Sequence, residues 1–142
     1  MYKHMLFATD LTEDTDYLVD KVRNMRGLTG AKLSLIHVVE PLPGYNYAYL
    51  GIEDIEGQLI EEARQSIGKL GEKLQVAQSD QHIEVGPTKT KILKIADDTL
   101  ADLIICGSHG RHGLSLLLGS TANAILHGAK CDVLTVRLPE EK

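Results

Sequence analysis

The stretch Leu103-Ile104-Ile105-Cys106-Gly107-Ser108-His109-Gly110, followed after eight further residues by Gly119-Ser120-Thr121, decides the fold of this chain. Its first four residues form an uninterrupted apolar run, which is typical of a buried strand. Gly107 and Gly110 allow a sharp turn and a close approach of the backbone to a ligand. The small residues at 119–121 open a helix-like segment, and the free N–H groups of a helix start suit a phosphate. The stretch therefore predicts a strand followed by an anion-binding turn.

The rest of the chain alternates strand-like and helix-like segments in the same way. Continuous apolar strands that alternate with helices favour a parallel sheet covered on both faces. Right-handed crossovers then predict an α/β fold, a doubly wound five-stranded parallel sheet with helices on both faces. The predicted strands are 5–8, 32–39, 81–85, 103–106 and 131–138. The first predicted helix begins at Thr12 and ends at Gly27 to Gly30. The other three run from 54 to about 76, from Thr88 through Leu100, and from 121 to 127.

Length and composition limit the class of protein. A chain of 142 residues can bury a core of its own, so we expect a single domain over residues 1–142. The formal net charge of −5 argues against general binding to nucleic acid or to a membrane surface, since both are anionic. The first residues lead directly into a strand-like run, unlike a signal peptide, and no apolar run approaches the roughly 20 residues of a membrane helix. We therefore expect a cytoplasmic protein with no membrane or nucleic-acid partner.

The cysteines and histidines do not predict a metal site. Cys106 and Cys131 lie at the edges of apolar runs and are expected to be reduced, buried residues. His109 and His112 have a helical spacing that would suit a metal together with Cys106, but no fourth ligand has a suitable spacing. His37 lies inside a predicted strand, where we expect a hydrogen-bonded residue of the core or its rim.

The expected ligand site lies at the carboxyl ends of the strands, where the strand order reverses in doubly wound sheets. Thr9 and Asp10 follow the first strand, the glycine-rich turn follows the fourth, and Val38 ends the second nearby. Asp10 has two open interpretations, a ligand contact or a bond to the start of the next helix near Thr12. The P-loop, dinucleotide and hydrolase-elbow motifs are all absent, and Asp10 alone could serve as a base. We therefore predict no catalytic residues.

These segments together resemble the universal stress protein family over nearly the whole chain. The resemblance implies the strand order 3-2-1-4-5 and a homodimer in which the last strand, residues 133–138, pairs antiparallel across the two-fold axis. Such pairing would also protect an apolar sheet edge from association. The residues that carry the resemblance are 8–12, 35–38, 101–110, 118–121 and 131–136.

The family has two branches, which differ in nucleotide binding. One branch binds ATP through the motif Gly-x-x-Gly-x9-Gly-[Ser/Thr], and the other, similar to universal stress protein A, lacks nucleotide binding. This chain has eight residues between Gly110 and Gly119, one fewer than the ATP-binding motif. One helical residue is about 100° of rotation and about 1.5 Å of rise, enough to misplace a phosphate donor unless Gly113 lets the turn adjust. The tyrosine-bearing segment 45–51 also resembles the second branch.

For the nucleotide-binding branch, the resemblance implies a role for each matching residue. Ala8, Thr9 and Asp10 border the adenine and ribose, and Val38 contacts the adenine; Cys106 and Gly107 lie under the ribose and phosphates; Ser108 and His109 line the turn; Gly110, Gly119, Ser120 and Thr121 hold the phosphates. Mg²⁺ would be held mainly by phosphate oxygens and water, as hard cations prefer. We expect a sensor or regulator that binds an adenine nucleotide of the ATP type. The alternatives are a nucleotide-free homodimer that acts through protein interactions and a slow ATPase.

Overall fold

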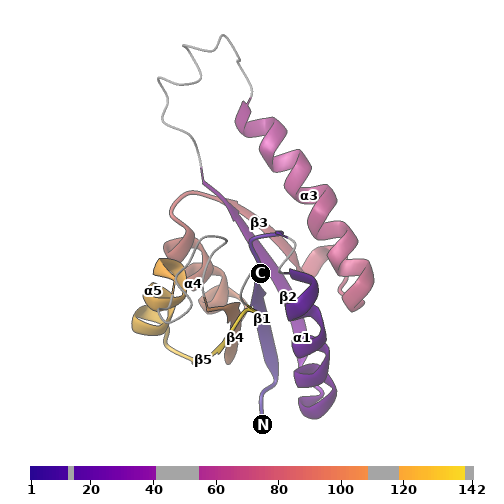
Figure 1. Cartoon of the computed structure of the whole chain (residues 1–142), viewed down its shortest axis with the longest axis vertical. Helices are drawn as coiled ribbons and strands as arrows, with labels where there is room; N and C mark the ends of the chain where they lie inside the picture. Colours follow the sequence, from indigo (N-terminus) through magenta and orange to yellow (C-terminus); the bar gives the residue numbers. More distant parts are fainter. Residues whose placement is uncertain (13–14, 41–54, 109–118, 140–142) are drawn as a thin grey trace.

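The computed structural model describes residues 1–12, 15–40, 55–108 and 119–139 (Figure 1). Within these ranges five strands form one sheet in the order β3-β2-β1-β4-β5, and every pairing between neighbours is parallel. The predicted α/β fold and strand order are thus confirmed. The elements are β1 (His4–Ala8), α1 (Thr15–Thr29), β2 (Lys32–Val39), α3 (Ile55–Leu74), a short 3₁₀ turn (Gln78–Asp80), β3 (Gln81–Val85), α4 (Thr88–Asp98), β4 (Leu103–Gly107), α5 (Ser120–Gly128) and β5 (Asp132–Val136).

β1 lies at the centre of the sheet because it pairs with β2 on one side and with β4 on the other. Met5, Leu6 and Phe7 are completely buried there. Successive side chains of a strand point to opposite faces, so Met5 and Phe7 belong to one core cluster and Leu6 to the other. A strand buried on both faces needs the continuous apolar run that this segment has.

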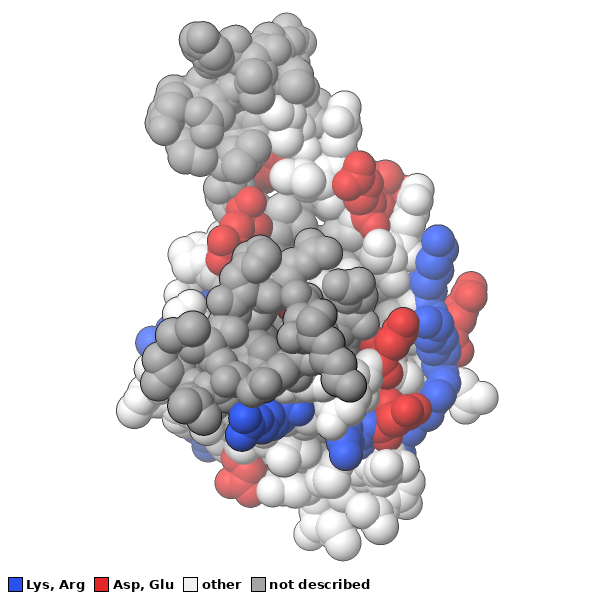
Figure 2. Space-filling view, in the orientation of Figure 1, with Lys and Arg blue, Asp and Glu red and all other residues white. Residues whose placement is uncertain are grey.

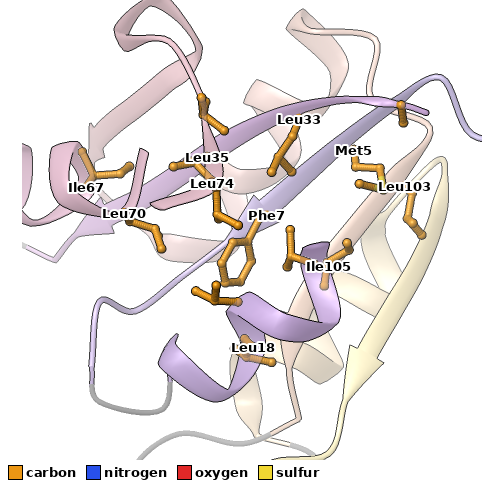
Figure 3. Packing of buried hydrophobic residues seen from close by; sticks show 14 of the residues in the cluster. Met5, Phe7, Leu18, Leu33, Leu35, Ile67, Leu70, Leu74, Leu103 and Ile105 are labelled. Atoms are coloured by element: carbon orange, nitrogen blue, oxygen red, sulfur yellow. The ribbon is translucent and has the colours of Figure 1, made fainter. Parts of the chain in front are cut away.

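Helices cover both faces of the sheet, as predicted. α1 and α3 cover one face, where Phe7 packs among Leu18, Leu70 and Ile105 (Figure 3). α4 and α5 cover the opposite face through Ile92, Ile95, Ala122 and Ile125 (Figure 1). Each helix thus buries one apolar stripe against the sheet and leaves its polar face outside.

One predicted end of α1 is wrong, and the other end lies partly outside the described residues. α1 spans Thr15–Thr29, and before it the Thr12 N–H and hydroxyl both bond to the Asp10 carboxylate; the predicted start directly after Thr12 falls on residues 13–14, which the structure does not describe. Gly27 lies inside α1, since a single helical glycine costs only about 1 kcal/mol. The stop is Gly30, which has a φ of +68° just beyond the helix.

The third predicted helix extends through Leu100, and this end is wrong. α4 ends at Asp98, and Leu100 follows with a φ of +58° and an exposed fraction of 84%. The Thr99 hydroxyl bonds back to the Ile95 carbonyl oxygen over 2.7 Å, which satisfies a carbonyl of the last turn. The chain therefore leaves the helix before Leu100 can reach the core.

The two cysteines lie on the face covered by α4 and α5. Cys106 is buried within that cluster, and Cys131 is half-buried and packs against it. Burial is the largest cause that raises the pKa of both thiols above their usual range. Both side chains are therefore neutral thiols near pH 7.

Among the described helices, none is both long and apolar enough to cross a membrane.

Candidate functional site

A cavity of about 320 Å³ opens at the carboxyl edge of the sheet. Its walls come from the ends of β2, β1 and β4 and from the first residues of α4 and α5, and the switch in strand order lies at β1. The expected position of the site, at the reversal of the strand order, therefore coincides with a cavity. The predicted site residues that line it are Ala8, Thr9, Asp10, Val38, Cys106, Gly107, Gly119, Ser120 and Thr121.

Of the other three predicted residues, only Ser108 is described, and it does not line the cavity. His109 and Gly110 lie outside the described residues, as does His112. Ser108 is buried, and its polar groups bond to backbone instead: its N–H donates to the Val136 carbonyl oxygen over 2.8 Å, and its hydroxyl accepts from the Leu138 N–H over 3.3 Å. Ser108 thus joins β4 to the segment after β5.

The N-terminus of α5 faces the cavity without a side-chain cap. Gly119 precedes the helix in an extended conformation, and its N–H donates to the Ser108 carbonyl oxygen. The first N–H groups of a helix have no intrahelical partner, and the helix dipole makes this end positive. Because Ser120, Thr121 and Ala122 line the cavity, this wall suits an anionic group.

Asp10 makes the predicted bond near the start of the next helix and also borders the cavity. One carboxylate oxygen, Oδ1, accepts from the Thr12 N–H over 3.0 Å and from the Thr12 hydroxyl over 2.7 Å. The same residue is exposed and lines the cavity. Within the described ranges nothing donates to Oδ2, so this oxygen can accept a hydroxyl from a ligand while Oδ1 holds the loop.

Thr9 is buried, and its N–H, hydroxyl and carbonyl groups all bond to other groups of the protein. Its N–H donates to the Ile36 carbonyl oxygen over 3.0 Å, and its hydroxyl lies 2.9 Å from the Thr15 hydroxyl and accepts from the Leu11 N–H over 3.0 Å. His37 Nδ1 lies 2.8 Å from the Thr9 carbonyl oxygen. Thr9 therefore shapes the cavity wall through its position rather than through a free polar group.

Gly107 ends β4 where a side chain would be tightly packed. A Cβ atom at this position would lie 3.0 Å from Leu138 Cδ1 and 3.5 Å from Leu18 Cδ1. Leu138 and Leu18 both line the cavity. The glycine therefore lets these two leucines close the floor of the cavity, which the sequence did not predict.

Sequence analysis also missed two polar residues at the opposite end of the cavity. Glu40 follows β2, Thr88 begins α4, and both line the cavity. The Thr88 hydroxyl donates to Glu40 Oε1 over 2.6 Å. Their positions directly after a strand and at a helix start are the signal that could have identified them. His37, predicted to be a hydrogen-bonded residue of the core or its rim, has such a bond and lines the cavity as well.

The described lining carries two acidic side chains, Asp10 and Glu40, and no lysine or arginine. The donors for an anion therefore come from the backbone at α5. Over the described ranges, no group of three or more His, Cys, Asp or Glu side chains is arranged to hold a metal ion.

Comparisons with known proteins identify the family. The model of the universal stress protein family matches residues 1–137. Universal stress protein A homolog 2 from Coxiella burnetii is 47% identical over 141 residues, which cover 96% of each chain. The structure of MJ0577, a universal stress protein of Methanocaldococcus jannaschii, has a TM-score of 0.83 with 27% identity over 99% of each chain.

A further solved universal stress protein, in complex with cAMP, has a TM-score of 0.62 and 22% identity, covers 97% of this chain and 98% of its own, and supports the fold alone. The family model, the 47% identical relative and the shared topology agree over nearly the full length. This chain belongs to the universal stress protein family.

Proposed function

We propose that this chain is a single-domain stress-response regulator that binds an adenine nucleotide of the ATP type in the cavity at the carboxyl edge of the sheet. The observation that carries the proposal is that one cavity has both an apolar wall, from β2 and α4, and the uncapped N-terminus of α5. A nucleotide needs both, because its base is flat and apolar on its faces and its phosphates are anionic.

The base fits the wall formed by Val38, Ile92 and Ile125. These side chains are buried and belong to the core cluster under α4 and α5. The volume of about 320 Å³ lies at the lower end of the range for small-molecule sites. Ala8 and Asp10 border the position expected for the sugar, with Asp10 Oδ2 as an acceptor for a ribose hydroxyl.

The phosphates fit the other end, at Gly119, Ser120 and Thr121. Backbone N–H groups and two hydroxyls supply donors there without a charged side chain. Because Asp10 and Glu40 make the described lining acidic, a Mg²⁺ ion held by phosphate oxygens and water would lower the charge that enters the cavity. His109 and Gly110 complete this end in the proposal.

The direct test is calorimetric titration of the purified protein with ATP and Mg²⁺, together with analysis of acid-released supernatant for nucleotide carried from the cell. We expect binding that Gly119→Val abolishes, since a β-branched side chain would occupy the approach to the α5 N–H groups. Gly27→Ala is the control, because a Cβ at Gly27 meets nothing within 4 Å. Absence of binding at millimolar nucleotide in the folded protein would overturn the proposal.

An alternative function is a nucleotide-free homodimer that acts through protein interactions, as expected for a universal stress protein A type. The observation that favours it is β5, an edge strand whose residues Val133–Val136 are only half-buried. We propose antiparallel pairing of residues 133–138 between two copies in the cytoplasm, which would satisfy the open edge. Sedimentation of the nucleotide-free protein tests the dimer; a monomer at micromolar concentration would exclude it.

Regulation rather than catalysis is the better proposal for the nucleotide site. Asp10 is the residue that the sequence offers as a base, but its Oδ1 already accepts two hydrogen bonds from Thr12. Hydrolysis needs a group that positions water or accepts a proton. ATP turnover that disappeared in Asp10→Ala while binding persisted would show that the slow ATPase is the correct alternative.

A further inference from the structure

We propose that β3 and α4 form an acid-responsive edge of the sheet, which loosens when His82 takes up a proton. His82 lies on β3 and does not line the cavity at the carboxyl edge. The acid response of this edge is therefore independent of nucleotide binding.

His82 carries a buried nitrogen atom without a hydrogen-bond partner. Among the residues that the structure describes, its Nε2 is the one buried side-chain nitrogen or oxygen atom that lacks a partner. Buried polar groups are almost always hydrogen-bonded, so an exception needs a physical explanation. In a neutral ring Nε2 can remain an unprotonated acceptor, and the fold then leaves only a lone pair unsatisfied.

The side chain of His82 lies on the face of the sheet that α4 and α5 cover. Its neighbour Ile83 packs against the core cluster on the opposite face, and successive side chains of a strand alternate between faces. In the parallel register of β2 and β3, His82 lies opposite Ile36, which belongs to the cluster under α4 and α5. His82 is therefore placed where α4 covers the outermost strand.

A proton on His82 would have no acceptor at Nε2. The imidazolium carries an N–H donor on both nitrogens, so Nε2 would become a buried and charged donor, which costs far more than a buried lone pair. His4 on the same face differs, because its Nδ1 lies 2.8 Å from the Thr99 carbonyl oxygen and its Nε2 lies 2.7 Å from the Ser34 hydroxyl. A hydroxyl oxygen accepts as well as donates, so a doubly protonated His4 keeps both partners whereas His82 does not.

The charged groups around His82 do not compensate for its burial. Burial is the largest cause that lowers the pKa of His82 below its usual range, and the positive charges of His4 and Lys32 add to the lowering. Asp80 and Glu84 act in the opposite direction. The Asp80 carboxylate lies 3.2 Å from the Lys32 ammonium, so much of its charge is already neutralised.

The covering helix supplies no free carboxylate either. The charged residues of α4 are Lys89, Lys91, Lys94, Asp97 and Asp98. Asp98 pairs with Lys94 over 3.2 Å, and Asp97 pairs with Lys130 over 3.7 Å. The remaining two are lysines, which offer no acceptor to an imidazolium. A protonated His82 therefore gains a partner only when the edge opens to water.

β3 is the strand that acid can release at the lowest cost. It pairs with β2 alone, and none of its five residues is fully buried. Elements with few buried contacts open locally before the rest of a domain. Only Gly86 and Pro87 separate β3 from α4, so the two elements should loosen together. Because Thr88 and Ile92 of α4 also line the cavity, the opening would reach the cavity wall.

The lowered pKa gives the direction of the pH dependence. The unfolded value for histidine is about 6.5, so the folded edge keeps its full stability above that pH. Stability is lost as the pH falls from about 6.5 toward the folded pKa of His82. Unperturbed carboxylates titrate near pH 4, so a comparison of about pH 7.5 with 5.5 reports mainly on histidines.

The test is amide hydrogen exchange of the full chain at these two pH values, read by mass spectrometry and divided by the intrinsic rates of an unstructured chain. We expect the protection of residues 81–98 to fall by about threefold or more at the lower pH, while residues 5–7 of the central strand keep theirs. His82→Leu keeps an apolar side chain that takes up no proton, so the fall should nearly disappear. His127→Leu, on the exposed side of α5, is the matched control and should keep the wild-type fall.

NMR titration of the His82 ring in the wild-type protein provides a second measurement that needs no variant, and its midpoint should lie below about 6.5. A midpoint at or above that value would overturn the proposal, as would an equal fall in protection in folded His82→Leu. Unchanged protection of residues 81–98 in the wild-type protein would overturn it as well. An equal loss in residues 5–7 would show that acid weakens the whole domain, and the edge would then not be a separate acid-responsive element.

Discussion

The imidazole of His37 and the backbone of Thr9 are joined by a hydrogen bond at the point where two strands end beside the cavity. His37 Nδ1 donates to the Thr9 carbonyl oxygen over 2.8 Å, while the Thr9 N–H donates to the Ile36 carbonyl oxygen over 3.0 Å. A carbonyl oxygen only accepts, so the bond also fixes the proton of the neutral ring on Nδ1. The end of β1 is thus held to β2 from two directions.

His37→Phe should lower the free energy of unfolding by about 1–2 kcal/mol, because the carbonyl oxygen of the buried Thr9 loses its side-chain donor. Urea denaturation at neutral pH measures the change. His127→Phe on the exposed side of α5 is the matched control and should have little effect. An equal loss in both variants would show that the hydrogen bond is not the cause.

The fold was predictable because its signals are local and repeated. The run Met5 to Ala8 has no polar residue, and in a doubly wound sheet such a run belongs to a central strand; β1 is that strand. The helix ends were less predictable, because Gly27 is tolerated inside α1 while Gly30 stops it. Sequence alone does not show whether a glycine faces open space.

The cavity was predictable in position but not in composition. Asp10 and Gly119 follow directly from the strand-to-helix turns in which ligands bind. Thr88 was recognised only as a helix start, and Leu138 only as part of the last strand. Their contribution depends on tertiary packing, such as the 3.0 Å approach of Leu138 to a Cβ at Gly107.

Gly68 and Gly71, two of the three glycines inside α3, should respond oppositely to alanine. A Cβ at Gly71 would collide with Gln81 Nε2 and lie 3.0 Å from the Val76 carbonyl oxygen, and Gln81 Nε2 donates to that same carbonyl oxygen over 3.0 Å. Gly71→Ala must therefore displace Gln81 and break this bond, at a cost of about 1–3 kcal/mol. A Cβ at Gly68 meets nothing within 4 Å, so Gly68→Ala should stabilise by about 0.5–1 kcal/mol.

Thermal unfolding of both variants beside the wild-type protein measures this contrast. Both substitutions add one methyl group to the same helix, so helix propensity alone would shift both melting temperatures upward. A rise for Gly71→Ala equal to that for Gly68→Ala would contradict the predicted collision with Gln81.

Asp102 should contribute stability that depends on pH. Its carboxylate accepts from the Lys3 N–H over 2.9 Å and from the His4 N–H over 3.1 Å, which ties β1 to the start of β4. The hydrogen bond from Lys3 is the largest cause that lowers the pKa of Asp102 below its usual range. A lowered folded pKa means that the contribution is present above the unfolded value of about 4 and is lost as the pH falls through the folded pKa.

Asp102→Asn should therefore be less stable than the wild-type protein at pH 7, and the difference should shrink as the pH falls below about 4. Urea denaturation at pH 7, 5 and 3 measures the trend. Asp98→Asn removes an exposed ion pair with Lys94 and should show a small difference throughout. If the difference in the free energy of unfolding between wild type and Asp102→Asn grew toward acid pH, the predicted direction of the pH dependence would be wrong.

Cys106 should report whether the cavity is occupied. Its thiol is buried against the cavity wall, its Sγ lies 4.0 Å from the Thr135 hydroxyl, and burial is the largest cause that raises its pKa. The thiolate is the reactive form, so alkylation should be slow at pH 7 and should accelerate as the pH rises past the usual range of a thiol. The test uses Cys131→Ser, in which Cys106 is the remaining cysteine. Millimolar ATP with Mg²⁺ should slow the alkylation of Cys106 further, because the nucleotide would cover the cavity wall. Mass spectrometry of the labelled protein measures the rate. The control is ATP added to the Gly119→Val variant in the same background, where the rate should not change. Equal rates with and without ATP in the protein that carries Gly119 would mean that the nucleotide does not cover Cys106.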